Sequence, residues 1–251
     1  MAEVKQELTK KDQASALVDW MKPAMATALP RHLNADRMVR IVLTEMRRNP
    51  KLVTCTKQSL AGSVIMASQL GLEPGVNGQC WLVPYGNEAT FIIGYQGLIE
   101  LAYRSNMVEF VIGEAVYEND EFTYSLGTEQ FIKHVPAEAD RGKLKAAYAV
   151  AKMKGASMPV FKVLTKEDIL KVKASSPAAN SAHSPWNTWP ETMWVKTAVK
   201  KLMKFIPKSA EINKALEADD RVDAGKPQPF SDVIDLPEEK EGKGIEIEDV
   251  K

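Results

Sequence analysis

A series of short extended segments between residues 107 and 164 constrains the fold of this chain more than any other feature. Five runs rich in β-branched and aromatic residues follow one another with only short turns between them: 107–120, 121–126, 130–136, 143–154 and 158–164. Parallel strands need long crossover connections, and these turns are too short to supply them. The segment therefore predicts antiparallel strand pairing.

Helical patterns precede and follow this region. Asn34 is suited to capping a helix that stops at Asn49-Pro50, and a second helix is expected from Thr56 to a left-handed Gly71. A hairpin centred on Gly86-Asn87 comes next, and a capping box at Thr165 begins a later helix. We expect an α+β fold: an antiparallel sheet with a hairpin, flanked by helices, with a flexible N-terminal arm and an acidic C-terminal tail.

The charge is distributed unevenly along the 251 residues, although the formal net charge is zero. Residues 209–251 hold thirteen acidic and six basic side chains, and residues 1–208 hold twenty acidic and twenty-seven basic ones. A basic body with an acidic tail is frequent in nucleic-acid-binding proteins, although a solvated tail without a partner has the same composition. We predict three parts: an arm at 1–33 that is suited to linking subunits, a DNA-binding core at 34–208, and a largely disordered tail at 209–251.

The segment WPETMWVKTAVKKLMKFIPKS, residues 189–209, predicts a helix with one basic side. At 100° per residue its apolar residues share one side, apart from Met193. Five lysines share the other side: Lys196, Lys200, Lys201, Lys204 and Lys208. Lysines four positions apart repel each other, and after Glu191 the segment has no acid. A polyanion such as nucleic acid would relieve that repulsion. Acids elsewhere in the fold, or a membrane surface, are the alternatives.

Aromatic residues accompany this basic helix. Trp186, Trp189 and Trp194 are available either for core packing or for stacking on bases. We assign Trp194 to the core and leave Trp186 open between the two roles.

A second candidate surface lies where the hairpin leads into a helix. Tyr95 and Gln96 stand between two glycines at the helix start, where free N–H groups attract phosphate, although a tight turn explains the glycines equally well. Arg104 ends this helix. Further candidate contacts are Lys57, near another helix start, and Lys133. Four arginines of the first helix, at 37, 40, 47 and 48, are suited to phosphate, a neighbouring subunit or solvent.

Catalytic patterns are missing from the sequence. The three histidines, His32, His134 and His183, are scattered, and none stands at zinc-site spacing from a cysteine. No GxxxxGK[ST] loop for nucleotide phosphates occurs. The acidic stretch Glu118–Phe122 is interpreted as one solvated turn rather than a magnesium site. We therefore expect no enzyme activity, no cofactor and no metal.

The location that the sequence favours is a reducing cytoplasm. The first twenty residues lack the apolar segment of a secretory signal, and no uncharged apolar run reaches eighteen residues. Cys55 and Cys80 are expected to be small buried or partly buried thiols.

Two long motifs resemble the RecT family of phage and prophage single-strand annealing recombinases. The first is SVIMASQLGLEPG followed by CWLVPYGNEATFIIGYQGLIELAYRS, and the second is SPWNTWPETMWVKTAVKKLMKFIPKS. They lie more than ninety residues apart in the family's order, and the resemblance covers about residues 52–209.

The resemblance implies a protein that binds single-stranded DNA and pairs complementary strands through a duplex intermediate without ATP. Family members form homo-oligomeric rings or helical filaments and work in the bacterial host cytoplasm beside an exonuclease. Their C-terminal tails contact partners such as the single-strand-binding protein. A non-enzymatic oligomeric scaffold with incidental DNA binding is the alternative, and a metal-dependent nuclease is a third class.

These expectations combine into one mechanism. A basic groove, continued by neighbouring subunits, holds the backbone of one strand with its bases outward, and base pairing reads the sequence. The lysine helix is the main wall of that groove. Substitution of Lys200 and Lys204 by alanine is then expected to lower DNA binding while the fold survives.

Overall fold

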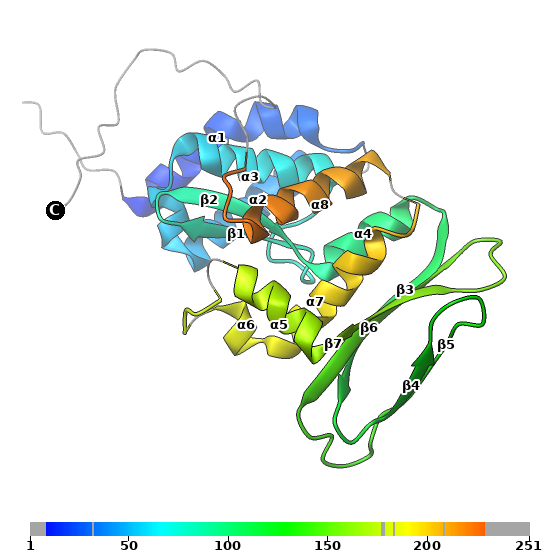
Figure 1. The fold of residues 1–251 in the computed structure, drawn as a ribbon. Coiled ribbons are helices and arrows are strands. Elements are labelled where there is room, and N and C mark those ends of the chain that lie inside the picture. Colours follow the sequence, from blue (N-terminus) through cyan, green and yellow to red (C-terminus); the bar gives the residue numbers. More distant parts are fainter. Residues whose placement is uncertain (1–8, 32, 177–178, 183, 208, 229–251) are drawn as a thin grey trace, which may run out of the picture.

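The structure is a computed structural model that describes residues 9–31, 33–176, 179–182, 184–207 and 209–228. The predicted α+β class is confirmed, because runs of helices and runs of antiparallel strands follow one another along the chain (Figure 1). The first half contains α1 (Lys10–Ala28), α2 (Ala35–Arg48), the 3-10 helix η1 (Pro50–Thr54), α3 (Lys57–Leu70), β1 (Cys80–Tyr85), β2 (Glu88–Ile93) and α4 (Tyr95–Arg104). The second half contains β3 (Val108–Tyr117), β4 (Glu121–Ser125), β5 (Phe131–Val135), β6 (Leu144–Met153), β7 (Val160–Thr165), α5 (Lys166–Ser175), α6 (Pro185–Thr188), α7 (Pro190–Met203) and α8 (Ala210–Asp223).

The prediction of an N-terminal arm is wrong for residues 10–28, which form helix α1. Thr9 and Asp12 make a capping box at its start. Val18, Met21 and Met25 are fully buried against a core shared with α2 and α3. Their spacing of three and four residues places them on one helix face, which is why the segment packs rather than extends. Residues 1–8 lie outside the described residues.

Local signals at element ends are confirmed. The Asn34 side chain accepts N–H bonds at the start of α2, and Thr56 caps α3. Gly71 ends α3 with φ of 62°, in the left-handed region that glycine tolerates. The β1–β2 hairpin turns between Tyr85 and Glu88, as the Gly86-Asn87 pair predicts.

The five predicted strands of the 107–164 region are all present and pair antiparallel. They form two sheets: a three-stranded sheet of order β3-β6-β7 and the two-stranded β4–β5 hairpin. Helix α7 packs across one face of the larger sheet (Figure 1). Gly113 of β3 permits this close approach, because a Cβ atom there would stand 2.7 Å from Val199 of α7.

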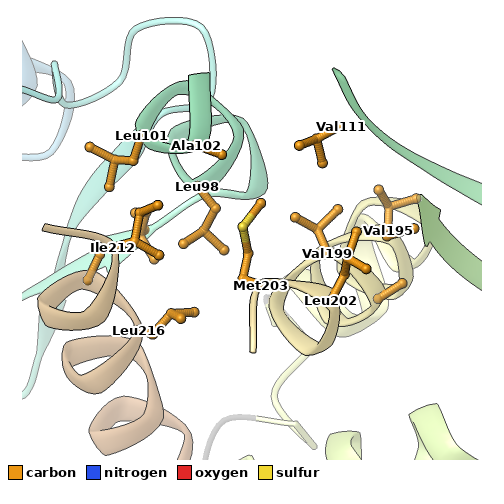
Figure 2. Close-up of a cluster of buried hydrophobic side chains, with 14 of the residues drawn as sticks. Leu98, Leu101, Ala102, Val111, Val195, Val199, Leu202, Met203, Ile212 and Leu216 are labelled. Carbon is orange, nitrogen blue, oxygen red and sulfur yellow. The ribbon is translucent and has the colours of Figure 1, made fainter. Parts of the chain in front are cut away.

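Helix α8 corrects the predicted tail. Residues 209–251 are expected to be largely disordered, but residues 210–223 form this helix, which Ser209 caps. Ile212 and Leu216 pack beside Leu98 and Met203 in the main hydrophobic core (Figure 2). Burying such side chains contributes about 1.5–3 kcal/mol each, which outweighs the helix's acidic composition. Residues 229–251 lie outside the described residues.

Candidate nucleic-acid interface

Helix α7 has the two-sided character that its sequence predicts. Pro190 occupies its first turn, where a missing N–H costs nothing. Its apolar side is buried against the sheet, α4 and α8, with Val195, Val199, Leu202 and Met203 in the core (Figure 2). Trp194 is buried, as predicted. The helix ends at Met203, one turn before the predicted stop at Pro207.

Trp186, whose role the sequence leaves open, is also buried in the core. It lies in α6, the short helix that precedes α7. Trp189, between the two helices, is exposed.

Three lysines of α7 are paired with aspartates of α8. Lys196 donates to Asp219 at 2.8 Å, and Lys204 lies 3.1 Å from Asp220. The ammonium group of Lys200 lies 2.8 Å from Asp219 and 2.9 Å from Asp220.

Lys200 also donates to Asp223, so it contacts three carboxylates. Of the alternatives that the sequence left open, acids elsewhere in the fold therefore hold for Lys196, Lys200 and Lys204. The acids come from α8, which follows α7 along the chain and packs mainly on β2, α4 and α3.

This ion-pair cluster is buried at its centre and open at one end. Asp219 has 1% of its side chain exposed, and Lys200 has 10%. Burial alone would raise the pKa of Asp219, but Lys196 and Lys200 outweigh it, so its pKa is lowered. Burial likewise opposes the charge of Lys200, yet Asp219 and Asp223 hold its pKa above its usual range. At the open end, Lys204 and Asp220 have 44% and 47% of their side chains exposed.

The burial of Lys200 among carboxylates changes the expectation that its substitution spares the fold. Removing one partner of a buried pair leaves the other charge buried and uncompensated. Lys196 and Lys200 thus have a structural role in attaching α8.

Lys201 differs from these lysines. Its side chain is exposed, and it makes no ion pair with any described residue. Lys208, the fifth predicted contact, lies outside the described residues.

A cleft of about 160 Å³ opens beside the ion pairs. We name it the lysine cleft, and its walls come from α5, α6, α7 and α8: Val172, Ser175, Trp186, Met193, Lys196, Thr197, Lys200, Lys201, Lys204, Asp220 and Asp223. Four ammonium groups meet Asp220 and Asp223 in the wall and the buried Asp219 beside it, so one positive charge is left in excess. The lysines therefore face both the protein's own acids and an open depression.

The second predicted surface is explained mostly by packing. A Cβ atom at Gly94 would stand 2.0 Å from the carbonyl oxygen of Gly78, and one at Gly97 would stand 2.2 Å from that of Gln79. These glycines therefore allow the approach of a neighbouring loop. Tyr95 is half-buried against the core, and Gln96 is exposed at the helix start.

Arg104 is occupied within the fold. Its guanidinium donates to the carbonyl oxygens of Leu70 and Gly71, at 2.9 and 2.8 Å, and to Glu100 at 3.0 Å. Arg104 thus satisfies carbonyls at the end of α3, which a helix terminus leaves unpaired. The structure assigns it to the fold rather than to a ligand.

The remaining predicted contacts lie apart from the cleft lining. Lys57 is half-buried in the first turn of α3. Lys133 pairs with Glu121 across the β4–β5 hairpin. The structure does not bring either lysine into the cleft wall.

Three of the four arginines of α2, Arg37, Arg40 and Arg48, line a separate depression of about 480 Å³ beside the loop Pro74–Asn77. Arg37 pairs with Glu73, and Arg48 pairs with Glu45 at 3.0 Å. Carboxylates thus offset two of the guanidinium charges in this depression.

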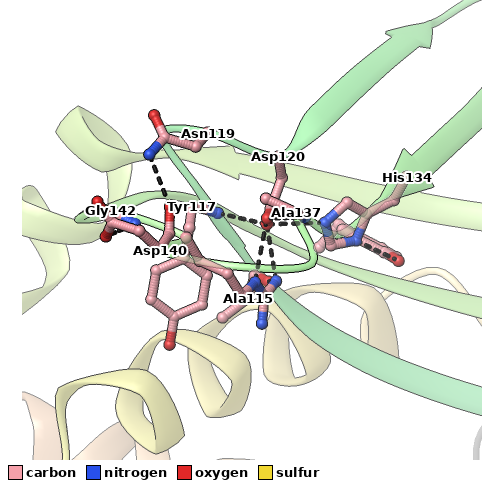
Figure 3. A network of polar contacts seen from close by, with 10 residues as sticks. Ala115, Tyr117, Asn119, Asp120, His134, Ala137, Asp140 and Gly142 are labelled. Atoms are coloured by element: carbon pink, nitrogen blue, oxygen red, sulfur yellow. Dashed lines mark hydrogen bonds and ion pairs between the residues drawn. The ribbon is translucent and has the colours of Figure 1, made fainter.

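The acidic turn at 118–122 is solvated only in part: Glu118 and Glu121 are exposed, but the interpretation is wrong for Asp120. Asp120 is fully buried and accepts two hydrogen bonds from Arg141, at 2.7 and 3.0 Å (Figure 3). Backbone N–H groups of Tyr117 and Ala137 donate to the same carboxylate, and His134 lies 3.0 Å away. The hydrogen bonds from Arg141 hold the pKa of Asp120 well below its usual range, although burial alone would raise it. The backbone N–H groups and His134 lower this pKa further. The network fastens the β4–β5 hairpin to the larger sheet.

The two cysteines, Cys55 and Cys80, are buried free thiols, as predicted. Among the described residues, no three His, Cys, Asp or Glu side chains are placed to hold a metal ion. No described helix combines the length and apolar character that crossing a bilayer requires.

Comparison with known proteins shows which family the chain belongs to. The RecT family profile matches residues 36–232, which include α7 and α8. Protein RecT of Escherichia coli strain K12 is 39% identical over 210 residues, covering 80% of this chain and 77% of that protein. The uncharacterized protein YqaK of Bacillus subtilis strain 168 is 29% identical over 184 residues, covering 70% of this chain and 63% of that protein. The resemblance over residues 52–209 is thereby confirmed and extended, and the chain belongs to the RecT family.

Proposed function

We propose that this protein binds single-stranded DNA along the lysine cleft and pairs complementary strands without ATP. As a member of the RecT family, it is a recombination protein of the annealing class. The observation that supports this location is the exposed position of Lys201 and Lys204 on a basic cleft wall within the matched region.

The four lysines of the cleft are not equivalent in this proposal. Lys201 is exposed and has no ion pair among the described residues, so a phosphate can approach it without displacing anything. The Lys204–Asp220 pair is about half exposed, and exposed pairs contribute about 0–1 kcal/mol, so a phosphate can replace the aspartate. Lys196 and Lys200 stay with α8, where Asp219 and Asp223 offset their charges.

The mechanism is electrostatic and geometric. Phosphates of one strand lie against Lys201 and Lys204, and the bases face away from the wall. A second strand then tests the exposed base edges, so sequence is read by pairing and few protein groups contact bases. Gln96, Tyr95 and Lys57 remain proposed backbone contacts. The proposal leaves out Arg104, because its guanidinium satisfies backbone carbonyls, and Lys133, because it lies outside the cleft lining.

Oligomers, an exonuclease and a single-strand-binding protein complete the proposed function. Neighbouring copies in a ring or filament would continue the cleft, so that one strand spans several subunits. We further propose that residues 229–251 contact protein partners and that the chain works in the bacterial cytoplasm without enzyme activity.

A second candidate function is an oligomeric scaffold that touches DNA incidentally. Exposed apolar side chains on the β4–β5 hairpin favour a contact between copies: Tyr124, Leu126, Phe131 and Val135. Such a scaffold would coat strands without accelerating their pairing.

An annealing assay separates the two functions. Complementary fluorescent oligonucleotides are mixed with the protein, and the rate of duplex formation is compared with that for a strand-coating protein. The proposal predicts acceleration by the wild type and its loss in Lys201→Ala/Lys204→Ala. The matched control is Lys143→Ala/Lys145→Ala, which removes two exposed lysines from the start of β6. Equal rates for the two double variants would contradict the assignment of the cleft.

A further inference from the structure

Two aromatic side chains stand exposed at the two ends of α7. Trp189, just before the helix, is 69% exposed, and Phe205, two residues after its end, is 64% exposed. Trp186 and Trp194, in the same segment, are buried. The fold thus places two tryptophans of this motif in the core and leaves the third, with Phe205, facing solvent.

The Phe205 ring lies among cations. It follows Lys204 directly and stands four positions after Lys201, so both proposed phosphate contacts are its neighbours. The ammonium group of Lys162, on β7, lies 5.2 Å from the centre of the ring. An exposed ring beside the ammonium group of Lys162, and close in sequence to two further lysines, has the chemistry of a stacking site for bases.

Trp189 lies at the opposite end of α7, three residues after Trp186, which lines the lysine cleft. Its N–H group donates to Pro185 at 2.8 Å, which fixes its backbone between α6 and α7. Trp189 precedes Met193, a residue of the cleft wall, by four positions. It also precedes Phe205 by sixteen positions, which corresponds to about 24 Å along a helix axis at 1.5 Å per residue.

We propose that Trp189 and Phe205 stack on bases of the strand that occupies the lysine cleft. The inference rests on the proposed function, and it assigns a base-binding role that the lysines lack. One base stacked at each end would keep the strand extended across α7. The bases between the two rings remain free to pair with a complementary strand.

The test compares two probes with the full chain: a thymidine oligonucleotide and an abasic strand of equal length. Both carry the same phosphates, and only the first has rings to stack. The wild type should bind the thymidine strand more tightly. Phe205→Ala and Trp189→Ala should each weaken thymidine binding about 5- to 150-fold, the range for one stacked base. They should leave abasic binding and its salt dependence unchanged.

Conservative variants separate stacking from packing. Phe205→Tyr should keep the preference for the thymidine strand, whereas Phe205→Leu, apolar but without a ring, should lose it. Tyr85→Ala, which removes an exposed aromatic at the end of β1, should behave as the wild type. Equal losses on both probes, or unchanged binding of both, would overturn the proposal. So would a loss confined to self-association, which would make the rings a contact between copies.

The lysine variant shows which idea has failed. Suppose that Lys201→Ala/Lys204→Ala weakens binding of both strands, while Phe205→Ala and Trp189→Ala keep the preference for the thymidine strand. The stacking proposal is then wrong, and the proposed phosphate contacts stand. If the lysine variant changes nothing but the aromatic variants lose the preference, stacking stands and the phosphate site lies elsewhere.

Discussion

The ammonium group of Lys200 lies 2.8 Å from a carboxylate oxygen of Asp219, and both side chains are buried between α7 and α8. That oxygen of Asp219 has no hydrogen bond of good geometry, so its contact with Lys200 is an ion pair only. Lys196 satisfies the other oxygen at 2.8 Å. The pair divides the lysines of α7 into a structural group and an exposed group.

Loss of Lys200 should destabilise the protein. Lys200→Ala leaves Asp219 buried with one cation fewer, and breaking a buried pair costs about 3–5 kcal/mol. Lys201→Ala, at an exposed neighbouring position, should stay within about 0.5 kcal/mol of the wild type. Urea unfolding measures both. In Lys200→Ala/Asp219→Ala the losses should be less than additive, and strict additivity would show that the two residues do not interact.

Truncation should distinguish α8 from the segment that follows it. A chain that stops at residue 207 loses α8 and uncovers Met203, Lys196 and Lys200, so we expect aggregation or loss of cooperative unfolding. A chain that stops at Gln228 keeps α8 and the bonds between Gln228 and the backbone of Phe91. It should unfold as the full chain does and still anneal naked DNA. Circular dichroism melting and the annealing assay test the pair, and a folded, active 1–207 chain would refute a structural role for α8.

The exposed lysines should set part of the salt dependence of DNA binding. Each phosphate contact on a single strand contributes about −0.7 to the slope of log affinity against log salt. Lys201→Ala/Lys204→Ala should therefore make the slope shallower by about 1.4. Fluorescence anisotropy between 50 and 200 mM salt measures it, with Lys143→Ala/Lys145→Ala as the control of equal charge. An identical slope for wild type and cleft variant would exclude these phosphate contacts.

The buried Asp120 should make stability depend on acid pH. Its pKa is depressed in the folded state, so its contribution is fully present above the unfolded value of about 3.9 and is lost as pH falls through the folded pKa. Asp120→Asn should be less stable than wild type at pH 7, and the difference should shrink towards pH 2. Urea midpoints across this range test it. As a control, Glu118→Gln, on the exposed part of the turn, should have the same stability as the wild type at each pH. If the stability difference between Asp120→Asn and wild type stays constant with pH, Asp120 does not link stability to pH.

Local features were predictable from the sequence because their causes lie within a few residues. The capping box of Thr165 and Asp168, the left-handed Gly71 and the two sides of α7 each follow from spacing along the chain. The antiparallel strands followed from short turns. The same reasoning failed for α1 and α8, where weak local patterns become helices because other elements cover their apolar sides.

The electrostatic setting of the lysines was not predictable from local spacing. Asp219 and Asp223 stand four positions apart, as do Lys196 and Lys200, and this matched spacing is the one signal that could have revealed the pairing. That signal decides nothing until the two helices are known to pack. The burial of Asp120 likewise depends on Arg141 and His134, which come from other segments.

Lysine footprinting tests the central claim most directly. The protein is acylated with and without a saturating thymidine oligonucleotide, and mass spectrometry gives the reactivity of each lysine. The account predicts that DNA protects Lys201 and Lys204, that Lys196 and Lys200 react little in either state, and that Lys143 and Lys145 are unaffected. Full reactivity of Lys201 and Lys204 on DNA-saturated protein would contradict it.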